Sequence, residues 1–409
     1  MDNPYRGVFE QHVIDVAFLW IQRSVAVYQP HYSSEALAQL EQRINRHLTG
    51  LLLQPELAWE VCEEALAFEE GGEIFVAAMV AFTSGDREKI ERAMRAGFAN
   101  TGTFKGLVSA LGWLPEEKRH LWVQKGLASN ELDDNLLAIA TCGIIAHDPG
   151  ESLLRLLKRG ERHPEHPLFT RCLRLIGELK RVDLVTAANK AATADNTDIR
   201  FWGIWSSILL GGHDYVLAME AYILQTNPWQ QKAIRLAFRV LPSDVADAWI
   251  DRLLHHPDQL RYGVKAIAAN ARPHLVQDLI ATMKDKEQAC VAGEAFSLLT
   301  GIDLKQQQLT RCPPQRDDER DDIDPDIEFE DAKLPWPDAD KIAALWQQRA
   351  ADFEDGHRYF LGQAINTAHL SDIVASGYQR QRHAAALELA LLAPSCPLHN
   401  TRAISQEIL

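Results

Sequence analysis

Apolar residues recur every three or four positions along most of this chain, the spacing that gathers them on one face of a helix. In the first seventy residues the pattern predicts three helices, with breaks at Pro30 and just before Pro55. Ser33 or Ser34 is suited to cap the second helix, and Pro55 to open the third. Nowhere does a period of two run over the length of a strand, so the pattern predicts no sheet.

From residue 71 onward the pattern repeats in units of an apolar helix, a short break and a second amphipathic helix. The units open near Gly71, Asn100, Glu131, Pro164, Asn196, Asn227, Pro257 and Lys286, with successive gaps of 29, 31, 33, 32, 31, 30 and 29 residues. A two-helix unit cannot bury its apolar stripe alone, whereas stacked units can. We therefore predict an all-α fold, a HEAT-like α-solenoid of stacked antiparallel helix pairs with N- and C-terminal helical caps.

The character of the chain changes after the repeats. Residues 317–331 hold ten acidic residues and one basic residue, so their net charge is 1 − 10 = −9, and prolines flank them. Such a stretch predicts a loop that does not pack into the core. Helical spacing then resumes at Ile342 and continues through residues 359–365 to the prolines near residue 395. The predicted domains are an N-terminal helical region (1–70), the solenoid (71–304), an acidic proline-rich linker (305–337) and a C-terminal helical region (338–409).

Charge and composition narrow the classes of partner. The 409 residues carry a net charge of −15, which argues against nucleic acid or an anionic membrane surface as the main partner. The six cysteines form no CxxC pair, so neither a disulfide framework nor a zinc site is indicated. The apolar run over residues 13–21 is interrupted by Asp15 and lacks a basic leader. We expect no secretory signal and no membrane span, and hence a cytoplasmic location.

Reactive motifs are not apparent in the sequence. It contains no phosphate-binding loop, no HExxH and no GxSxG. Two histidine pairs, His163 with His166 and His255 with His256, adjoin prolines and are expected to lie in solvated turns rather than to bind a metal. Asp322, Asp324, Asp326 and Glu328 alternate like the start of a calcium loop, but Ile327 replaces the turn glycine and Lys333 the distal carboxylate. We predict no catalytic residue, cofactor or metal ligand.

Aromatic and basic side chains are the remaining candidates, because large aromatics and arginines anchor protein interfaces. The candidate partner-binding residues are Trp202, Trp205, Trp229, Trp249, Arg380 and Arg382. For the tryptophans the alternative role is to fill the core. The two arginines stand at the start of a predicted helix, where they would either be solvated or hold the acidic linker.

Three blocks of sequence resemble an uncharacterised proteobacterial family. They are FLWIQRSVAVYQPHYSSEALAQLEQRINRHLTGL (residues 18–51), AGEAFSLLTGIDL (292–304) and GYQRQRHAAALELALLAPSCPLHNTRA (377–403). The third block has His399 where the family pattern would place phenylalanine. The resemblance implies a HEAT-like repeat protein encoded in type VI secretion gene clusters, near spike, adaptor and effector genes. It implies no activity and no catalytic residues.

From the pattern and the resemblance together we expect a non-enzymatic, cytoplasmic protein that binds another protein. The expected role is that of an adaptor or chaperone in loading a type VI secretion effector or spike component. One alternative is an immunity protein that neutralises a co-encoded toxin. Another is a HEAT-like enzyme such as a DNA glycosylase, which would need a basic groove that the net charge of −15 disfavours.

Overall fold

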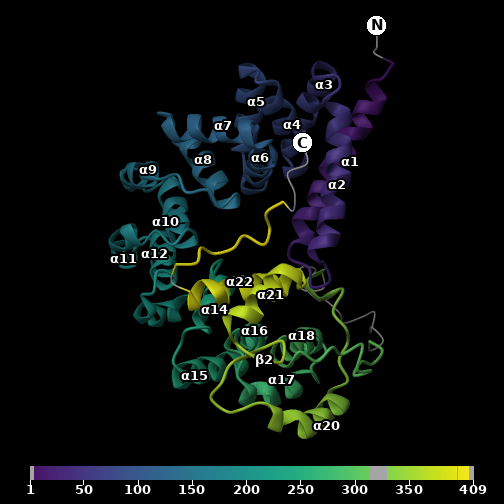
Figure 1. Cartoon of the computed structure of the whole chain (residues 1–409), viewed down its shortest axis with the longest axis vertical. Coiled ribbons are helices and arrows are strands. Elements are labelled where there is room, and N and C mark those ends of the chain that lie inside the picture. Colours follow the sequence, from purple (N-terminus) through teal and green to yellow (C-terminus); the bar gives the residue numbers. More distant parts are fainter. Residues whose placement is uncertain (1–3, 314–328, 394, 405–409) are drawn as a thin grey trace. The chain divides into compact units, whose positions relative to one another are not determined.

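A computed structural model describes residues 4–313, 329–393 and 395–404 of the chain. These residues are mostly helical, and the only strands among them are two residues long each, so the predicted all-α class is confirmed. They form two compact units. Unit 1 contains residues 1–28, 32–206 and 397–409, and unit 2 contains residues 29–31 and 207–396. The units are described separately below (Figure 1).

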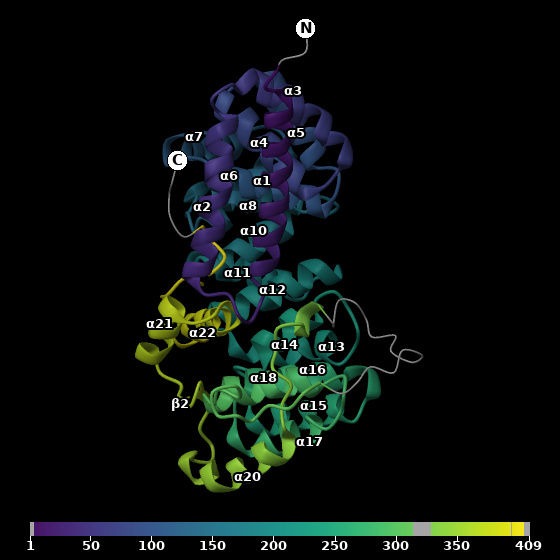
Figure 2. The same ribbon diagram turned by 90° about the vertical axis from the view of Figure 1, so that its right-hand side faces the viewer.

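Unit 1 begins with the three helices that the apolar spacing predicts. They are α1 (Arg6–Ala26), α2 (Ser34–Leu51) and α3 (Pro55–Ala65), followed by a single 3₁₀ turn, η1 (Leu66–Phe68). The Ser33 side chain accepts a hydrogen bond from the backbone N–H of Ala36 and caps α2, and Pro55 occupies the first turn of α3. Figure 2 shows α1 and α2 side by side as two long helices, in agreement with their contacts.

Paired helices follow from residue 71. The first helix of each pair begins no more than four residues after a predicted opening. These first helices are α4 (Gly71–Ser84), α6 (Thr101–Trp113), α8 (Leu132–Ile144), α10 (Leu168–Glu178), α12 (Thr197–Leu209), α14 (Gln230–Ala237), α16 (Leu260–Asn270) and α18 (Ala289–Thr300). The second helices are α5 (Arg87–Gly97), α7 (Glu116–Ala128), α9 (Glu151–Glu161), α11 (Val185–Ala191), α13 (Glu220–Ile223), α15 (Ser243–Leu254) and α17 (Val276–Thr282). Short 3₁₀ turns precede three of the second helices, namely η2 (Val182–Leu184), η3 (His213–Met219) and η5 (Pro273–Leu275). A further turn, η4 (Pro257–Gln259), precedes the first helix α16.

In unit 1 the first helices pack on one another in order, α4 on α6, α6 on α8 and α8 on α10. The α4–α6 contact depends on glycine, because a Cβ atom built on Gly106 would lie 2.1 Å from the backbone oxygen of Gly71. The Trp20 ring stacks on Phe75 of α4 at 5.7 Å between ring centroids, and Trp113 meets Phe75 edge-on at 5.3 Å. A continuous apolar core therefore joins α1 to the first helix pairs.

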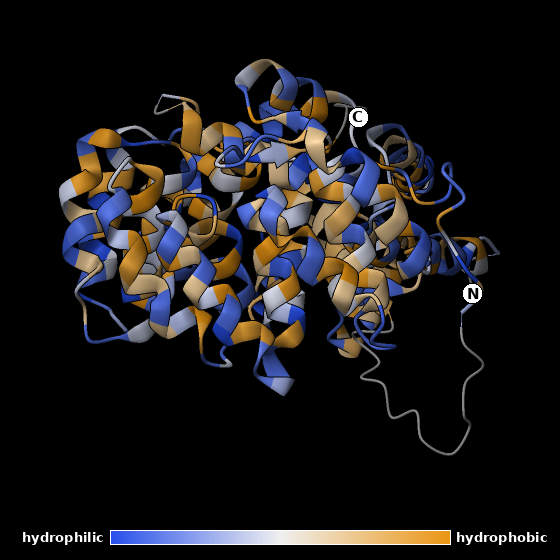
Figure 3. Ribbon diagram, turned by 90° about the horizontal axis from the view of Figure 1, so that it is seen from below, coloured by the Kyte–Doolittle hydropathy of each residue, from blue (hydrophilic) through white to orange (hydrophobic). Residues whose placement is uncertain are grey.

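In unit 2, α16 contacts both α14 and α18, and α15 and α17 pack alongside them. The chain then adds α20 (Ala339–Arg349), the 3₁₀ turn η6 (Ala350–Asp352), α21 (Thr367–Ser376) and α22 (Gln379–Leu392). In Figure 3, apolar and polar residues alternate around the helices, as expected when each helix buries one face. No helix in the described part of the chain combines the length and apolar character needed to cross a membrane.

The prediction of helical spacing through residues 359–365 is wrong. Those residues form a small antiparallel hairpin, β1 (Tyr359–Phe360) and β2 (Gln363–Ala364). The two turn residues, Leu361 and Gly362, have φ values of +47° and +81°, which a right-handed helix does not allow. Phe360 is buried against α21, so the apolar residues of this segment pack the hairpin against a helix.

Candidate functional site

Three of the four candidate tryptophans lie in the core. Trp202, Trp205 and Trp249 are 6%, 8% and 7% exposed, and the rings of Trp202 and Trp205 meet edge-on at 5.3 Å. Trp229 is half-buried, with the Lys232 ammonium 5.2 Å from its ring centroid. The exposure that an interface anchor requires is therefore absent at three of these positions.

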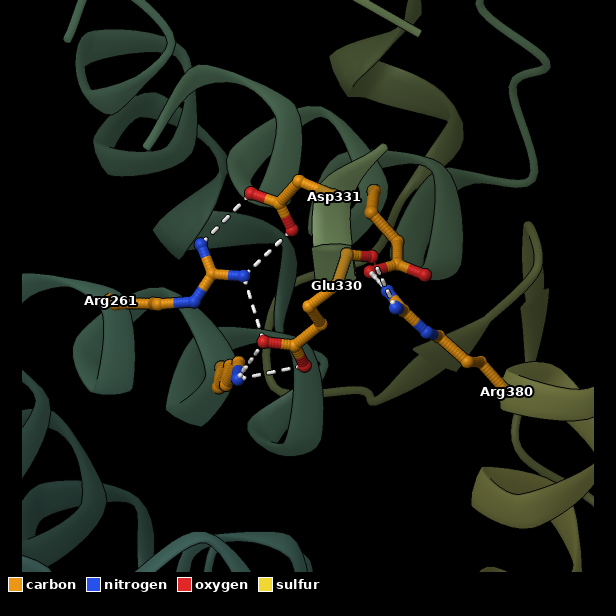
Figure 4. A network of polar contacts seen from close by, with 6 residues as sticks. Arg261, Glu330, Asp331 and Arg380 are labelled. Carbon is orange, nitrogen blue, oxygen red and sulfur yellow. Dashed lines mark hydrogen bonds and ion pairs between the residues drawn. The ribbon is translucent and has the colours of Figure 1, made fainter. Parts of the chain in front are cut away.

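The two candidate arginines are both held by groups of unit 2. Arg380 donates to a carboxylate oxygen of Glu294 at 2.6 Å and to the backbone oxygen of Glu330 at 2.7 Å (Figure 4). Arg382 donates to the backbone oxygen of Val374 and to the side chain of Gln379, both at 2.7 Å. Of the two roles considered for these arginines, Arg380 takes the one that holds the acidic segment.

The described end of that acidic segment is fixed by a network of charges. Arg261 on α16 donates to Asp331 at 2.7 and 3.0 Å and to Glu330 at 2.9 Å, and Lys265 donates to Glu330 at 3.0 Å. Burial raises the pKa of the Glu330 carboxyl, but the nearby cations outweigh burial and lower it to about 2. Glu330 and Asp331, at the end of the acidic stretch, are thus half-buried and ion-paired to α16, and neither belongs to the apolar core.

Glu294 completes this network (Figure 4) and is itself buried. Burial raises the pKa of its carboxyl despite the ion pair with Arg380. Every carboxylate in the network faces a cation of the same chain, so the network acts as a structural clamp. The four residues that resemble a calcium loop, 322, 324, 326 and 328, lie outside the described residues.

No reactive centre emerges from the other titratable groups that the structure describes. Burial raises the pKa of the Cys142 and Cys172 thiols to about 12, which leaves little of the reactive thiolate. His163 and His255 each lie near a single carboxylate, Glu165 and Asp251 respectively. Within residues 4–313, 329–393 and 395–404, no three His, Cys, Asp or Glu side chains are arranged to hold a metal ion.

The feature that does distinguish the surface of unit 1 is a second apolar face on α1. One face of this helix is buried and includes Val13 and Val16, as the sequence predicts. Ile14, Phe18 and Ile21 point away from that core and are 60%, 62% and 41% exposed. We call these three residues the α1 seam. A row of large apolar side chains that is exposed along one face of a helix is typical of a binding surface.

The α1 seam has the spacing of a helix-pairing surface. Its residues are separated by four and then three positions, and the series continues through half-buried Val25 to Tyr28. Alternating gaps of four and three keep side chains in line along a helix and allow a second helix to pack against them. This heptad spacing is visible in the sequence, where it lies beside the apolar stripe that α1 buries.

The last described residues, 397–404, run along unit 1 without forming a helix. The Leu398 N–H donates to the backbone oxygen of Glu178, and the Asn400 side chain donates to that of Ile144, both at 2.8 Å. Arg402 donates to the Tyr28 hydroxyl at 2.6 Å and lies over its ring. Tyr28, which continues the spacing of the seam, is therefore already in contact with this segment, whereas Ile14 and Phe18 remain exposed.

Arg23 links this terminal segment to the helical core. Its guanidinium donates to the buried Glu41 carboxylate at 2.7 Å and to the backbone oxygens of Arg402 and Ala403 at 3.0 and 3.2 Å. One buried cation thus serves α1, α2 and the end of the chain.

Comparison with known proteins gave no match among protein families, curated proteins or solved structures.

Proposed function

We propose that this chain is a non-enzymatic α-solenoid that binds another protein, and that the α1 seam is where a helix of that partner packs. The observation that carries the proposal is the exposure of Ile14, Phe18 and Ile21 on a helix whose opposite face is already buried. A helix that is apolar on both sides and packed on one has a second surface that is stabilised when water is excluded from it.

The spacing of the seam defines the chemistry of the partner. Positions 14, 18 and 21 accept knobs from an amphipathic helix with apolar residues at the same intervals of three and four. Phe18 is the central residue and the largest, so it is the expected anchor.

The biological setting of the proposal comes from the sequence resemblance. If the chain belongs to the family that its three blocks resemble, the partner is a type VI secretion component and the chain acts in the cytoplasm as an adaptor or chaperone. An immunity role would use the same surface against a toxin. Deletion of the gene distinguishes the two, because loss of an immunity protein makes a cell sensitive to its own kin.

The test is a photo-crosslinking amino acid at position 18 of the full-length chain, expressed in the native cell, with cross-linked products identified by mass spectrometry. We expect one partner protein in a stoichiometric complex, cross-linked through a helix. The Ile14→Glu variant of the same protein should weaken the complex by at least about tenfold, because a charge then faces the apolar contact.

The matched control is Leu53→Glu, since Leu53 is an apolar residue of unit 1 that is 77% exposed and lies outside the seam. Both substitutions are at exposed positions and should change the stability of the fold by no more than about 0.5 kcal/mol. A complex that survives Ile14→Glu contradicts the proposal. So does cross-linking of position 18 only to a second copy of this chain.

A further inference from the structure

An open hollow of about 710 Å³ lies along α9 in unit 1. It is lined by Glu151, Leu154, Arg155, Lys158, Arg159, Arg162 and His163. These residues come from one helix and the two positions that follow it, so the hollow has a continuous wall. Four permanent cations stand against one carboxylate, which gives a local charge of 4 − 1 = +3. This local positive charge is opposite in sign to the net charge of −15 of the whole chain.

Two of the four cations are held in place without being neutralised. Arg159 donates to the backbone oxygen of Ser129 at 3.0 Å and to the Asn135 side chain at 2.9 Å, and Arg155 donates to the backbone oxygen of Leu127 at 2.8 Å. All of these acceptors are neutral, so both guanidinium groups are oriented and keep their full charge.

The other two cations are unengaged. Within the described residues, the side chains of Lys158 and Arg162 make no ion pair or hydrogen bond, and both residues are exposed. The nearest acidic residue on the helix, Glu161, is paired with Lys190 at 2.6 Å. Fixed arginine forks beside free cations form a surface that is complementary to carboxylates.

We propose that this hollow binds an acidic segment of a partner protein, with carboxylates on Lys158 and Arg162 and an apolar side chain on Leu154. Leu154 is 39% exposed and lies among the cations, so it offers an apolar contact inside a charged surface. The ligand is therefore a peptide in which acidic residues flank an apolar one. This surface is separate from the α1 seam and does not depend on it.

The observations favour a peptide over a nucleic acid. The positive wall is one helix of 11 residues, which is about 16 Å long, and Glu151 already interrupts it. Nucleic-acid surfaces need a longer track of cations for the phosphates. Single strands also stack on aromatic rings, and the lining has no aromatic residue other than His163.

The test is fluorescence anisotropy with the full-length protein and a labelled peptide of glutamates flanking one leucine, at several salt concentrations. We expect saturable binding that weakens as salt rises. The double variant Lys158→Glu with Arg162→Glu should raise the Kd for the peptide by at least about tenfold. Neither side chain contributes a hydrogen bond to the fold, so the double variant should remain folded.

The control is Arg87→Glu combined with Arg92→Glu, which changes the net charge by the same amount on exposed residues of α5 in the same unit. This variant should bind the peptide within about twofold of wild type. If both double variants lost peptide affinity equally, the effect would come from the net charge of the protein and not from the hollow, and the proposal would be overturned. Absence of binding overturns it as well, and so does tighter binding of single- or double-stranded DNA than of the peptide. The seam variant Ile14→Glu should leave peptide binding unchanged, which separates this inference from the proposed function.

Discussion

Glu388 on α22 is the shared counter-charge of two arginines inside unit 2. It is buried, its carboxylate lies 2.6 Å from Arg358 and 3.0 Å from Arg239, and Arg358 also donates to the backbone oxygens of Ala269 and Asn270. Burial lowers the pKa of Arg239 to about 10 in spite of this partner. Two guanidinium groups therefore share one carboxylate in a place with little water.

We predict that Glu388→Gln lowers the free energy of unfolding by about 3–5 kcal/mol, because it leaves buried cations without a counter-charge. Urea denaturation followed by circular dichroism measures this change. Asp352→Asn is the control, since Asp352 pairs with Arg349 at the surface and is about half exposed, and its loss should cost less than about 1 kcal/mol. Similar values for the two variants would show that the buried cluster is not essential to the fold.

At the scale of elements, the surroundings of two glycines predict opposite effects on stability when each is replaced by alanine. Gly106 lies where α4 and α6 cross closely, and Gly7 faces open space. Gly106→Ala should destabilise the protein by at least about 2 kcal/mol, because its Cβ would overlap the backbone of Gly71 and force the helices apart. Gly7→Ala, in the exposed first turns of α1, meets no atom within 4 Å and should stabilise the protein by about 0.5–1 kcal/mol. Thermal unfolding of both variants checks the pair, and destabilisation by both would refute the steric explanation.

The sequence predicted those elements well where apolar spacing and capping residues agree. Asn100 illustrates this, since its side chain accepts from the Thr103 N–H and opens α6 where the repeat pattern places a boundary. The pattern failed at residues 359–365, because apolar residues three or four apart also suit a hairpin whose turn needs positive φ. It also does not identify the outward face of α1 as exposed, since which of its two apolar faces is covered depends on how α2 and α4 pack against it.

The candidate site, like the fold, could be predicted from the sequence only in part. Aromatic composition drew attention to Trp202 and Trp205, and both are in the core. The net charge of the whole chain does not reveal the basic wall of α9. A local sum along residues 155–162, where four of eight residues are cations, would have indicated it.

At the scale of the whole molecule, several carboxylates have a lowered pKa because cations hold them. For Glu330 burial acts in the opposite direction, but Lys265 and Arg261 bring the pKa to about 2, and for Glu178 Arg174 and Arg171 likewise outweigh burial. A carboxyl whose folded pKa is depressed adds stability above its unfolded pKa, and this stability is lost as the pH falls through the folded value. Glu294, with its raised pKa, contributes in the opposite sense.

We therefore predict that the midpoint of urea denaturation is highest near neutral pH and falls steadily between about pH 4.5 and pH 2. The Glu330→Gln variant should be less stable than wild type at pH 7 and should approach it as the pH falls toward 2, because only wild type has this ion pair to lose. Denaturation series at several pH values test the prediction, and parallel curves for the two proteins would contradict it.

Unit 1 is built from both ends of the chain, and this has a consequence for its synthesis. Its residues up to 206 leave the ribosome before the 190 residues from 207 to 396 (396 − 207 + 1 = 190), and residues 397–404 follow those. At usual rates of translation this interval lasts roughly 10 to 40 s. Throughout it, the carbonyls of Arg402 and Ala403 that accept hydrogen bonds from Arg23 have not yet been made. A nascent chain therefore holds an incomplete unit 1 while unit 2 is made, and a product that stops before residue 397 never completes it.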